Sequence, residues 1–198
     1  MIRYEDDWLL VVDKPVGLPT QAGKNRAAGL YEQLCADRRY VGLHHRLDQP
    51  TSGLVLFTLQ RRVNRAISMG FRSHTIGRTY RAVLWGEALD ETWDWPIDGA
   101  SAVTEVRVLH QGRGLSAVEL TLQTGRTHQI RHHAAMAGTP VVGDRRYGLE
   151  AAHRWPRLAL HAAELSFIHP VTDEPIVVSS PIPADLTELW SDTGATPQ

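Results

Sequence analysis

The sequence predicts an α+β fold with a central, mainly antiparallel mixed sheet flanked by helices. Short apolar runs are interrupted by segments of helical spacing, but the two do not alternate in the strict order that a parallel sheet requires. Residues 117–122 place Val118, Leu120 and Leu122 at every second position, which is typical of a strand with one buried face. With 198 residues the chain is long enough to bury a core.

The segment up to residue 73 is expected to hold two strands and two helices. In order, these are a strand at 8–12, a helix at 27–37, a buried strand at 54–59 and a helix at 60–73. A turn at 13–17 follows the first strand, because proline and glycine interrupt it. In the second helix an apolar stripe faces the core, while Arg61, Arg65 and Arg72 project elsewhere.

The rest of the chain, from residue 79 on, is expected to be richer in strands. Strands are predicted at 79–85, 103–109, 117–122, 158–167 and 176–179, and helices at 127–137 and 183–190. Gly138 suits the end of the first of these helices. Since the chain has no long linker and no clear internal repeat, we expect one domain over 1–192 and a disordered tail at 193–198.

Composition excludes several classes of protein. A single cysteine, Cys35, allows no internal disulfide and no cysteine metal cage. No stretch approaches the roughly 20 apolar residues that a membrane helix needs, and the polar first residues do not resemble a signal peptide. We therefore expect a soluble, cytoplasmic monomer with no obligate protein partner.

Charge is distributed unevenly, although the net charge is only −1. Residues 38–81 contain nine arginines and one acid, Asp48, whereas the segment after Arg157 contains six acids and no lysine or arginine. A second basic stretch, 125–157, holds six arginines and four histidines. Such separation gives a positive face that suits a polyanion such as nucleic acid, although charge clusters are also common on ordinary solvated surfaces.

The segment around Asp48 is the first candidate for chemistry. A proline and a glycine flank two hydroxyl side chains, Thr51 and Ser52, so Asp48 is expected on a loop just before the strand at 54–59. A carboxylate isolated among arginines suggests a catalyst that acts on nucleic acid. The alternative is an aspartate that only shapes the turn.

The second candidate is the run 124–133. On a helix, His128 and His132 would share a face at the i, i+4 spacing of zinc-binding helices, but Gln129 stands where such a site needs a glutamate base. A third zinc ligand is also missing, so zinc is the weaker interpretation. Arg131 is instead expected to face inward, where a buried cation needs a carboxylate. The isolated aspartate of the first candidate is the natural partner.

Two further residues are weaker candidates. Tyr80 lies on a predicted strand within a basic stretch, and it is either a core residue or a ring that stacks on a base. Lys14 opens the turn after the first strand and could meet a phosphate, but a solvated lysine is the safer interpretation. Neither residue identifies a function by itself.

Taken together, these segments resemble the RluA-type family of RNA pseudouridine synthases. The resemblance covers most of the chain and rests on motifs in the family's order. They are Lys14-Pro15-x-Gly17; His45-Arg46-Leu47-Asp48-x-x-Thr51-Ser52-Gly53-Leu54; Arg78-x-Tyr80-x-Ala82-x-x-x-Gly86; Gly125-Arg126-Thr127-His128-Gln129-Ile130-Arg131-x-His133, followed by Gly143-Asp144 and Tyr147; and Leu160-His161-Ala162 with Phe167-x-His169-Pro170. The motifs around Asp48 and Arg131 are the most specific.

The resemblance implies the pseudouridine synthase catalytic fold, an RNA cleft across its sheet, and isomerisation of uridine to pseudouridine. Asp48 would be the nucleophile, Arg131 its ionic partner and Tyr80 a ring against the target base. Whether the aspartate attacks C1′ or C6, or acts through a glycal, is left open. The substrate contacts that we expect are Arg46, Leu160, Thr51, His128 and Gln129.

The resemblance also implies RNA as the partner, either tRNA or rRNA stem-loops, and no metal or other cofactor, because the isomerisation is redox-neutral. Many members carry lysine where Arg78 stands, and arginine keeps the charge. Since the first motif begins at residue 14, we expect a compact member without an N-terminal S4-type domain. The competing hypotheses are a non-catalytic RNA-binding module on the same scaffold and a metal-dependent nuclease that uses the histidine-rich helix.

Overall fold

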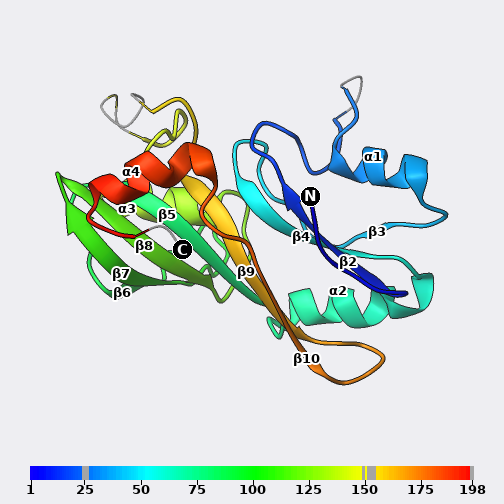
Figure 1. The fold of residues 1–198 in the computed structure, drawn as a ribbon. Helices are drawn as coiled ribbons and strands as arrows, with labels where there is room; N and C mark the ends of the chain where they lie inside the picture. Colours follow the sequence, from blue (N-terminus) through cyan, green and yellow to red (C-terminus); the bar gives the residue numbers. More distant parts are fainter. Residues whose placement is uncertain (24–26, 149, 151–154, 197–198) are drawn as a thin grey trace. The chain divides into compact units, whose positions relative to one another are not determined.

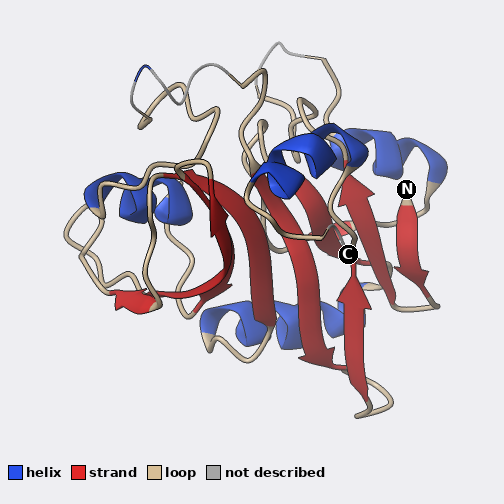
Figure 2. Cartoon of the chain, turned by 60° about the vertical axis from the view of Figure 1, so that its left-hand side comes forward, coloured by secondary structure: helices blue, strands red, loops and turns tan. Residues whose placement is uncertain are grey.

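A computed structural model describes residues 1–23, 27–148, 150 and 155–196 (Figure 1). The chain divides into two compact units: unit 1 comprises Met1–Gly77 and Glu164–Ser180, and unit 2 comprises Arg78–Ala163 and Pro181–Gln198. Within each unit the strands pair antiparallel, and helices flank them (Figure 2). The predicted α+β class with a mainly antiparallel sheet is therefore confirmed.

Unit 1 contains most of the N-terminal elements and one hairpin from late in the chain. Its strands are β1 (Ile2–Glu5), β2 (Leu9–Lys14), β3 (Gly42–Leu43), β4 (Ser52–Thr58), β10 (Pro175–Ser179) and residues 164–168 of β9 (Leu160–Ile168). Its helices are α1 (Leu30–Asp37) and α2 (Asn64–Arg72), and the chain enters α2 through a 3-10 turn, η1 (Arg61–Val63). Strand β4 pairs with both β2 and β3, and β9 pairs with β10.

The central strands of unit 1, β2 and β4, are buried on both faces. Figure 1 shows α1 and α2 on opposite sides of these strands. On the α2 side, Val63 and Ile67 pack against a cluster that includes Leu9, Leu54 and Leu165. All seven residues of β4 are buried. This double burial explains why the sequence shows a continuous apolar run here instead of alternation.

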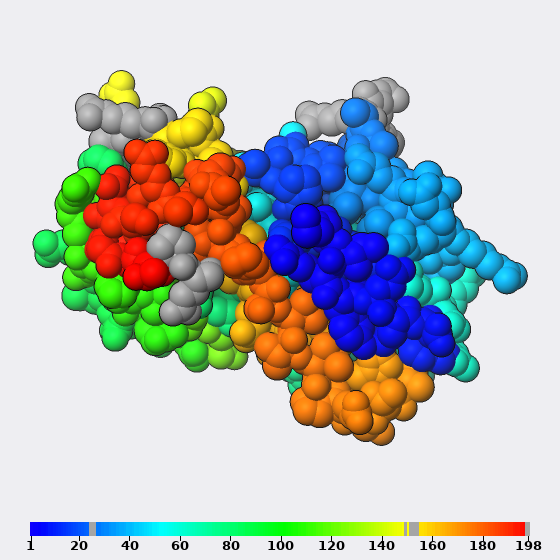
Figure 3. All heavy atoms as spheres, viewed as in Figure 1, coloured from blue at the N-terminus to red at the C-terminus, as the bar shows by residue number. Residues whose placement is uncertain are grey.

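The N-terminal strand lies beside the end of the β9–β10 hairpin, seen as blue next to orange in Figure 3. Arg3 forms an ion pair with Asp13 at 2.8 Å, and the Ser180 hydroxyl donates to the same carboxylate at 2.6 Å. Sequence reasoning missed β1 because its side chains are mostly exposed, so no alternation of apolar residues marks it.

Unit 2 contains the remaining described elements. Its strands are β5 (Gly77–Trp85, which belongs to this unit from Arg78 on), β6 (Glu91–Trp93), β7 (Thr104–Gly112), β8 (Leu115–Leu122) and residues 160–163 of β9. Its helices are α3 (Gln129–Met136) and α4 (Thr187–Asp192), and a 3-10 turn, η3 (Ala184–Leu186), precedes α4. Strand β8 pairs with β5 and β7, and β7 pairs with β6. The alternation predicted in β8 is confirmed at Val118 and Leu120, which are buried opposite Ala82 and Tyr80. It does not extend further, because Leu122 is only half-buried and residues 115–117 are all buried.

Every predicted helix and strand is present, with ends shifted by a few residues. The missed strands β3 and β6 are too short to show a period. Of the predicted disordered tail 193–198, residues 193–196 are described and Thr193 and Ala195 are buried, while 197–198 lie outside the described residues. In the described chain, no helix is both long and apolar enough to cross a membrane.

Two glycines of unit 2 share a left-handed φ of +77° but differ in their surroundings. A Cβ at Gly143 would overlap the backbone oxygen of Arg157, whereas a Cβ at Gly138 would point into open space. We expect Gly143→Ala to lower the free energy of unfolding by about 3 kcal/mol, since strain and overpacking add. Gly138→Ala should cost only about 1 kcal/mol. Urea unfolding measures both, and equal losses would contradict this account.

Candidate active site

Asp48 lies on a loop of unit 1 that joins β3 to β4, which we call the Asp48 loop (residues 44–51). The backbone N–H of Thr51 donates to the carbonyl of Asp48 at 3.0 Å and closes a turn. The Asp48 side chain is half-buried, and Arg46, two residues earlier, is exposed. The loop therefore carries a cation and an acid two residues apart, shortly before a fully buried strand.

The first motif and Thr20, which follows it, hold the Asp48 loop through hydrogen bonds to its backbone. The hydroxyl of Thr20 donates to the carbonyl of Leu47 at 2.9 Å and accepts from the Leu47 N–H at 3.1 Å. The N–H of Gly17 donates to the carbonyl of Gln49 at 2.9 Å. Both neighbours of the aspartate in sequence are thus fixed, which restricts where its carboxylate can point.

Lys14 is fully buried, so the prediction of a solvated lysine is wrong. Its ammonium donates to the carbonyls of Pro15 at 3.1 Å, Leu18 at 2.7 Å and Gln49 at 3.4 Å. An ammonium has three donors, and these three acceptors match them. The first motif therefore acts as a clamp on the Asp48 loop, and Lys14 is the side chain at its centre.

The start of the Asp48 loop is tied to α2. The His44 ring is within hydrogen-bonding distance of the Ser68 hydroxyl, at 2.9 Å, and the His45 ring stacks on Phe71 with centroids 4.4 Å apart. His45 also accepts a hydrogen bond from the N–H of Leu56 at 2.8 Å. Burial lowers the pKa of His44, which favours its neutral form in this network.

In unit 2, Arg131 projects from α3 into the interior, as the sequence predicts. Its Nε donates to Asp144 Oδ2 at 2.7 Å and its NH2 donates to Asp144 Oδ1 at 2.8 Å, a bidentate pair. Sequence reasoning expected Asp48 as the carboxylate partner and did not assign a role to Asp144. The sequence does contain a signal for this partner, because Asp144 directly follows Gly143 in the segment after the Arg131 motif. Asp48 belongs to unit 1, so its pairing with Arg131 stays a prediction.

The Asp144 carboxylate is buried and heavily hydrogen-bonded. Burial raises its pKa, but hydrogen bonds from Arg131 and from the N–H groups of Arg146 and Tyr147, with the attraction of the guanidinium, outweigh burial and lower the pKa. Asp144 is therefore a permanent anion near neutral pH, and it holds the Arg131 guanidinium in one orientation.

Gln129 is the first residue of α3, and it is only 3% exposed. Its Oε1 accepts from the Thr124 hydroxyl at 2.8 Å and from the Arg126 N–H at 2.9 Å. Its Nε2 donates to the carbonyl of Val103 and the hydroxyl of Thr104, both at 3.0 Å. All four hydrogen-bonding positions of the amide are used within the protein. Gln129 thus shapes the loop before α3, a different contribution from the substrate contact that the sequence suggests.

His128 precedes α3 with a left-handed φ of 55°, so it does not lie on the helix. The i, i+4 geometry of a zinc-binding helix is therefore not formed with His132. Instead both rings meet Tyr147: His128 Nδ1 is 2.8 Å from the Tyr147 hydroxyl, and His132 lies 4.2 Å from the ring by centroids. Among the described residues, no three histidine, cysteine or acidic side chains gather as a metal site.

The remaining predicted site residues of unit 2 are buried. Tyr80 on β5 is 8% exposed, and Leu160 at the start of β9 is 3% exposed. In unit 1, Thr51 is also buried, at 2% exposure. The structure thus brings Asp48, Arg46 and Thr51 onto one loop of unit 1. It brings Arg131 and His128 together around Tyr147 in unit 2, where the Arg131 guanidinium lies 5.0 Å from the Tyr147 ring centroid.

Comparison with known proteins gives a consistent likeness. A family model described as RNA pseudouridylate synthase matches residues 8–136. The ribosomal large subunit pseudouridine synthase D of Xanthomonas campestris is 37% identical over 226 residues, which cover 96% of this chain and 68% of the relative. The uncharacterized RNA pseudouridine synthase YhcT of Bacillus subtilis is 35% identical over 213 residues, covering 95% and 70%.

A solved structure shows the same likeness. Human RNA Pseudouridylate Synthase Domain Containing 1 aligns with a TM-score of 0.79 and 26% sequence identity. The alignment covers 100% of this chain and 88% of the human one. The motif positions at Asp48, Tyr80 and Arg131 all fall within the residues that the family model matches.

Lys14→Met should loosen the Asp48 loop, because three carbonyls lose the ammonium that satisfies them. We expect the free energy of unfolding to fall by about 2–3 kcal/mol. The matched control is Gln49→Ala, which removes the exposed side-chain bond from Gln49 Nε2 to the Gly17 carbonyl between the same segments. The control should cost under about 1 kcal/mol. If both variants unfold at the same urea concentration, Lys14 is not the central contact.

Asp144→Asn should leave the Arg131 guanidinium buried beside a neutral amide, costing about 3–5 kcal/mol at pH 7. Because the pKa of Asp144 is lowered in the folded state, its stabilisation is present at neutral pH and is lost as the pH falls below about 4. The difference between wild type and variant should therefore shrink in acid. Asp192→Asn is the control, since that carboxylate is 35% exposed and its partner Arg113 is 77% exposed, and it should cost at most about 1 kcal/mol. A gap that stays constant down to pH 3 would refute this assignment.

Proposed function

The chain belongs to the RluA-type family of RNA pseudouridine synthases, enzymes that isomerise uridine to pseudouridine in RNA, and we propose that its substrate is ribosomal RNA and its nucleophile Asp48. The reaction breaks the C1′–N1 bond of the nucleotide and forms a C1′–C5 bond. The proton at C5 leaves and N1 takes up a proton. No electrons are gained or lost overall, so the proposed reaction uses no cofactor.

The construction of the Asp48 loop carries this proposal. A nucleophile must be held within a fraction of an ångström of its productive position, and its support must come from rigid elements. Thr20 fixes Leu47, and Lys14 and Gly17 fix Gln49, so the chain is restrained on both sides of Asp48. A residue that merely shapes a turn has no need of a buried ammonium behind it.

Arg131 and Tyr80 complete the proposed catalytic group. We infer that Arg131, already oriented by Asp144, offers its guanidinium to Asp48 and keeps that carboxylate ionised and aimed. Tyr80 would lie against the target base and assist removal of the C5 proton. Support for both roles comes from the family motifs and from the near-complete burial of both side chains.

Base isomerisation requires the target nucleotide to leave its stack, at a cost of a few kcal/mol. We propose that Arg46 fills the gap left behind, because it is exposed and lies two residues from Asp48. Leu160 would form an apolar wall of the pocket, and His128 would contact the RNA beside it. Thr51 would act through the shape of the Asp48 loop, because its side chain is buried. The amide of Gln129 would act only through the loop before α3.

Ribosomal RNA is preferred over tRNA because the relative that is 37% identical to this chain is named a ribosomal large subunit pseudouridine synthase. The enzyme would act as a monomer, since every residue in the proposed mechanism lies on this one chain. A cytoplasmic location suits an RNA substrate and the exposed free thiol of Cys35, which a reducing compartment protects.

Tritium release from 5-tritiated uridine tests the proposal, with ribosomal RNA and tRNA transcripts as separate substrates. Wild type should release label from ribosomal RNA, and Asp48→Asn should reduce release by at least about 10⁴-fold, as loss of a nucleophile does. The variant should still bind RNA, which a filter-binding assay checks. Equal release by both proteins would exclude Asp48 as the nucleophile. If tritium is released from tRNA and not from ribosomal RNA, the substrate is tRNA. If Asp48→Asn still restores the growth of cells that lack the protein, a non-catalytic RNA-binding module is favoured.

A further inference from the structure

The outer face of α2 and the turn before it carries four exposed arginines: Arg61, Arg62, Arg65 and Arg72. We call this set the arginine face. Positions 61, 65 and 72 are spaced i, i+4 and i+11, so they form one ridge on the side of the helix opposite the buried Val63 and Ile67. Between Asp48 and Glu87 the chain contains no acidic residue. The ridge is therefore of one sign.

The arginines of the arginine face differ from many other arginines of the chain in the groups that they contact. Elsewhere among the described residues, several arginines form ion pairs with carboxylates: Arg3, Arg38, Arg81, Arg107, Arg113, Arg131 and Arg157. Within the described residues, none of the four guanidiniums of the arginine face has a carboxylate partner. Two are supported by aromatic rings instead, with Arg62 3.4 Å from the Trp8 ring centroid and Arg61 5.2 Å from that of Tyr40. Like charges at i, i+4 cost a helix a few tenths of a kcal/mol.

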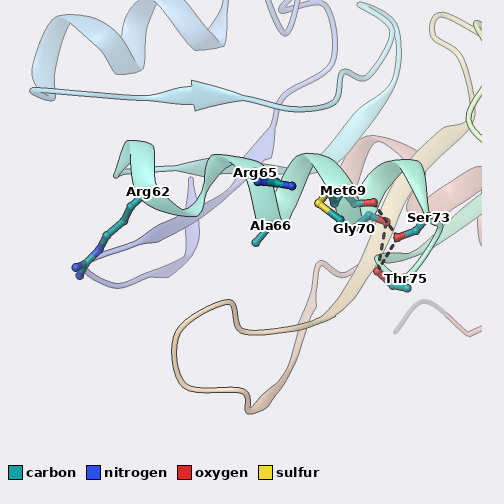
Figure 4. Close-up of a pocket in the computed structure, with 7 residues that line it drawn as sticks. All are labelled: Arg62, Arg65, Ala66, Met69, Gly70, Ser73 and Thr75. Carbon is teal, nitrogen blue, oxygen red and sulfur yellow. Dashed lines mark hydrogen bonds between the residues drawn. The ribbon is translucent and has the colours of Figure 1, made fainter.

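An open groove of about 560 Å³ runs beside the ridge (Figure 4). Arg62 and Arg65 stand toward one end of it, and Ser73 and Thr75 stand at the other. Met69 is 49% exposed in the wall of the groove. Cations, hydroxyls and the apolar side chains of Ala66 and Met69 are thus available together, and this mixture can contact the phosphates and the sugars of a nucleic-acid backbone.

The arginine face is mechanically connected to the Asp48 loop within unit 1. Ser68 of α2 is bonded to His44, and Phe71 stacks on His45, as described above. These two histidines immediately precede Arg46. A ligand fixed on α2 is therefore held in a defined relation to the Asp48 loop.

We propose that the arginine face of α2 binds backbone phosphates of the substrate RNA, outside the target nucleotide. The inference rests on the proposed function in that the polyanion is taken to be the RNA that the enzyme modifies. Guanidiniums are all the cations present here, and their planar forks bind phosphate oxygens bidentately. An acidic protein or a second copy of this chain would also meet a positive surface, but neither explains why α2 is tied to the Asp48 loop.

The test compares two double variants that remove the same charge. Arg65→Gln/Arg72→Gln alters the arginine face without touching the residues that stack on Trp8 and Tyr40. Arg107→Gln/Arg113→Gln alters two exposed arginines of unit 2 that are paired with Glu119 and Asp192. The probe is the ribosomal RNA transcript labelled with 5-tritiated uridine, with KM, kcat and the salt dependence of Kd as readouts.

We expect the α2 variant to raise KM and Kd about tenfold at low salt and to leave kcat unchanged. The slope of log Kd against log salt should fall by about 1.4–1.8, the amount expected for two lost phosphate contacts. The control should keep both the KM and the slope of wild type. Unchanged values in the α2 variant, or an equal effect in the control, would overturn the proposal.

Two further outcomes separate this proposal from the others. If wild type releases no tritium but the α2 variant alone loses RNA affinity and salt slope, the surface stands and the proposed function fails. If the α2 variant changes the sedimentation coefficient of the RNA-free protein and not its RNA affinity, the face joins two copies of the chain and the proposal is wrong.

Discussion

The buried ammonium of Lys14 is the contact on which the Asp48 loop depends. Three backbone carbonyls surround it, one of them from Gln49, and the three donors of a compact ammonium match these three acceptors. The arrangement converts the first motif from a simple turn into a support for the aspartate. Since a buried charge without partners is very costly, the carbonyls must stay in place, and the loop is rigid as a consequence.

Unit 2 solves a similar problem with a different pair of groups. Arg131 is buried, and Asp144 neutralises it through two parallel hydrogen bonds while two backbone N–H groups hold the carboxylate from behind. The two anchors differ in their response to acid. The carbonyl acceptors of Lys14 do not titrate, whereas Asp144 does, so acid weakens the support of Arg131 and not that of the Asp48 loop.

The sequence predicts the fold class, nearly every longer element and the two key motifs, because periodic apolar spacing and an acid isolated among arginines are visible without coordinates. It fails where tertiary context decides. Lys14 was expected in solvent because lysines are almost never fully buried, and only coordinates reveal carbonyls gathered around it. Asp144 was missed because its partner lies 13 residues earlier in sequence. The α3 boundary shifted because a left-handed histidine is not encoded by any helix signal.

A chain of net charge −1 can bind a polyanion because its arginines fall into two groups, those in ion pairs and those of the arginine face. In the described part of the chain, the ion-paired arginines are neutralised within the fold, so they add to its stability but little to its field. Those of α2 keep their full charge, and the few tenths of a kcal/mol lost to repulsion is small beside the stability of a domain. Net charge therefore says little about a partner of this protein. The location of guanidiniums without a carboxylate partner, on a helix bonded to the Asp48 loop, says more, because such guanidiniums can exchange their counterions for phosphates.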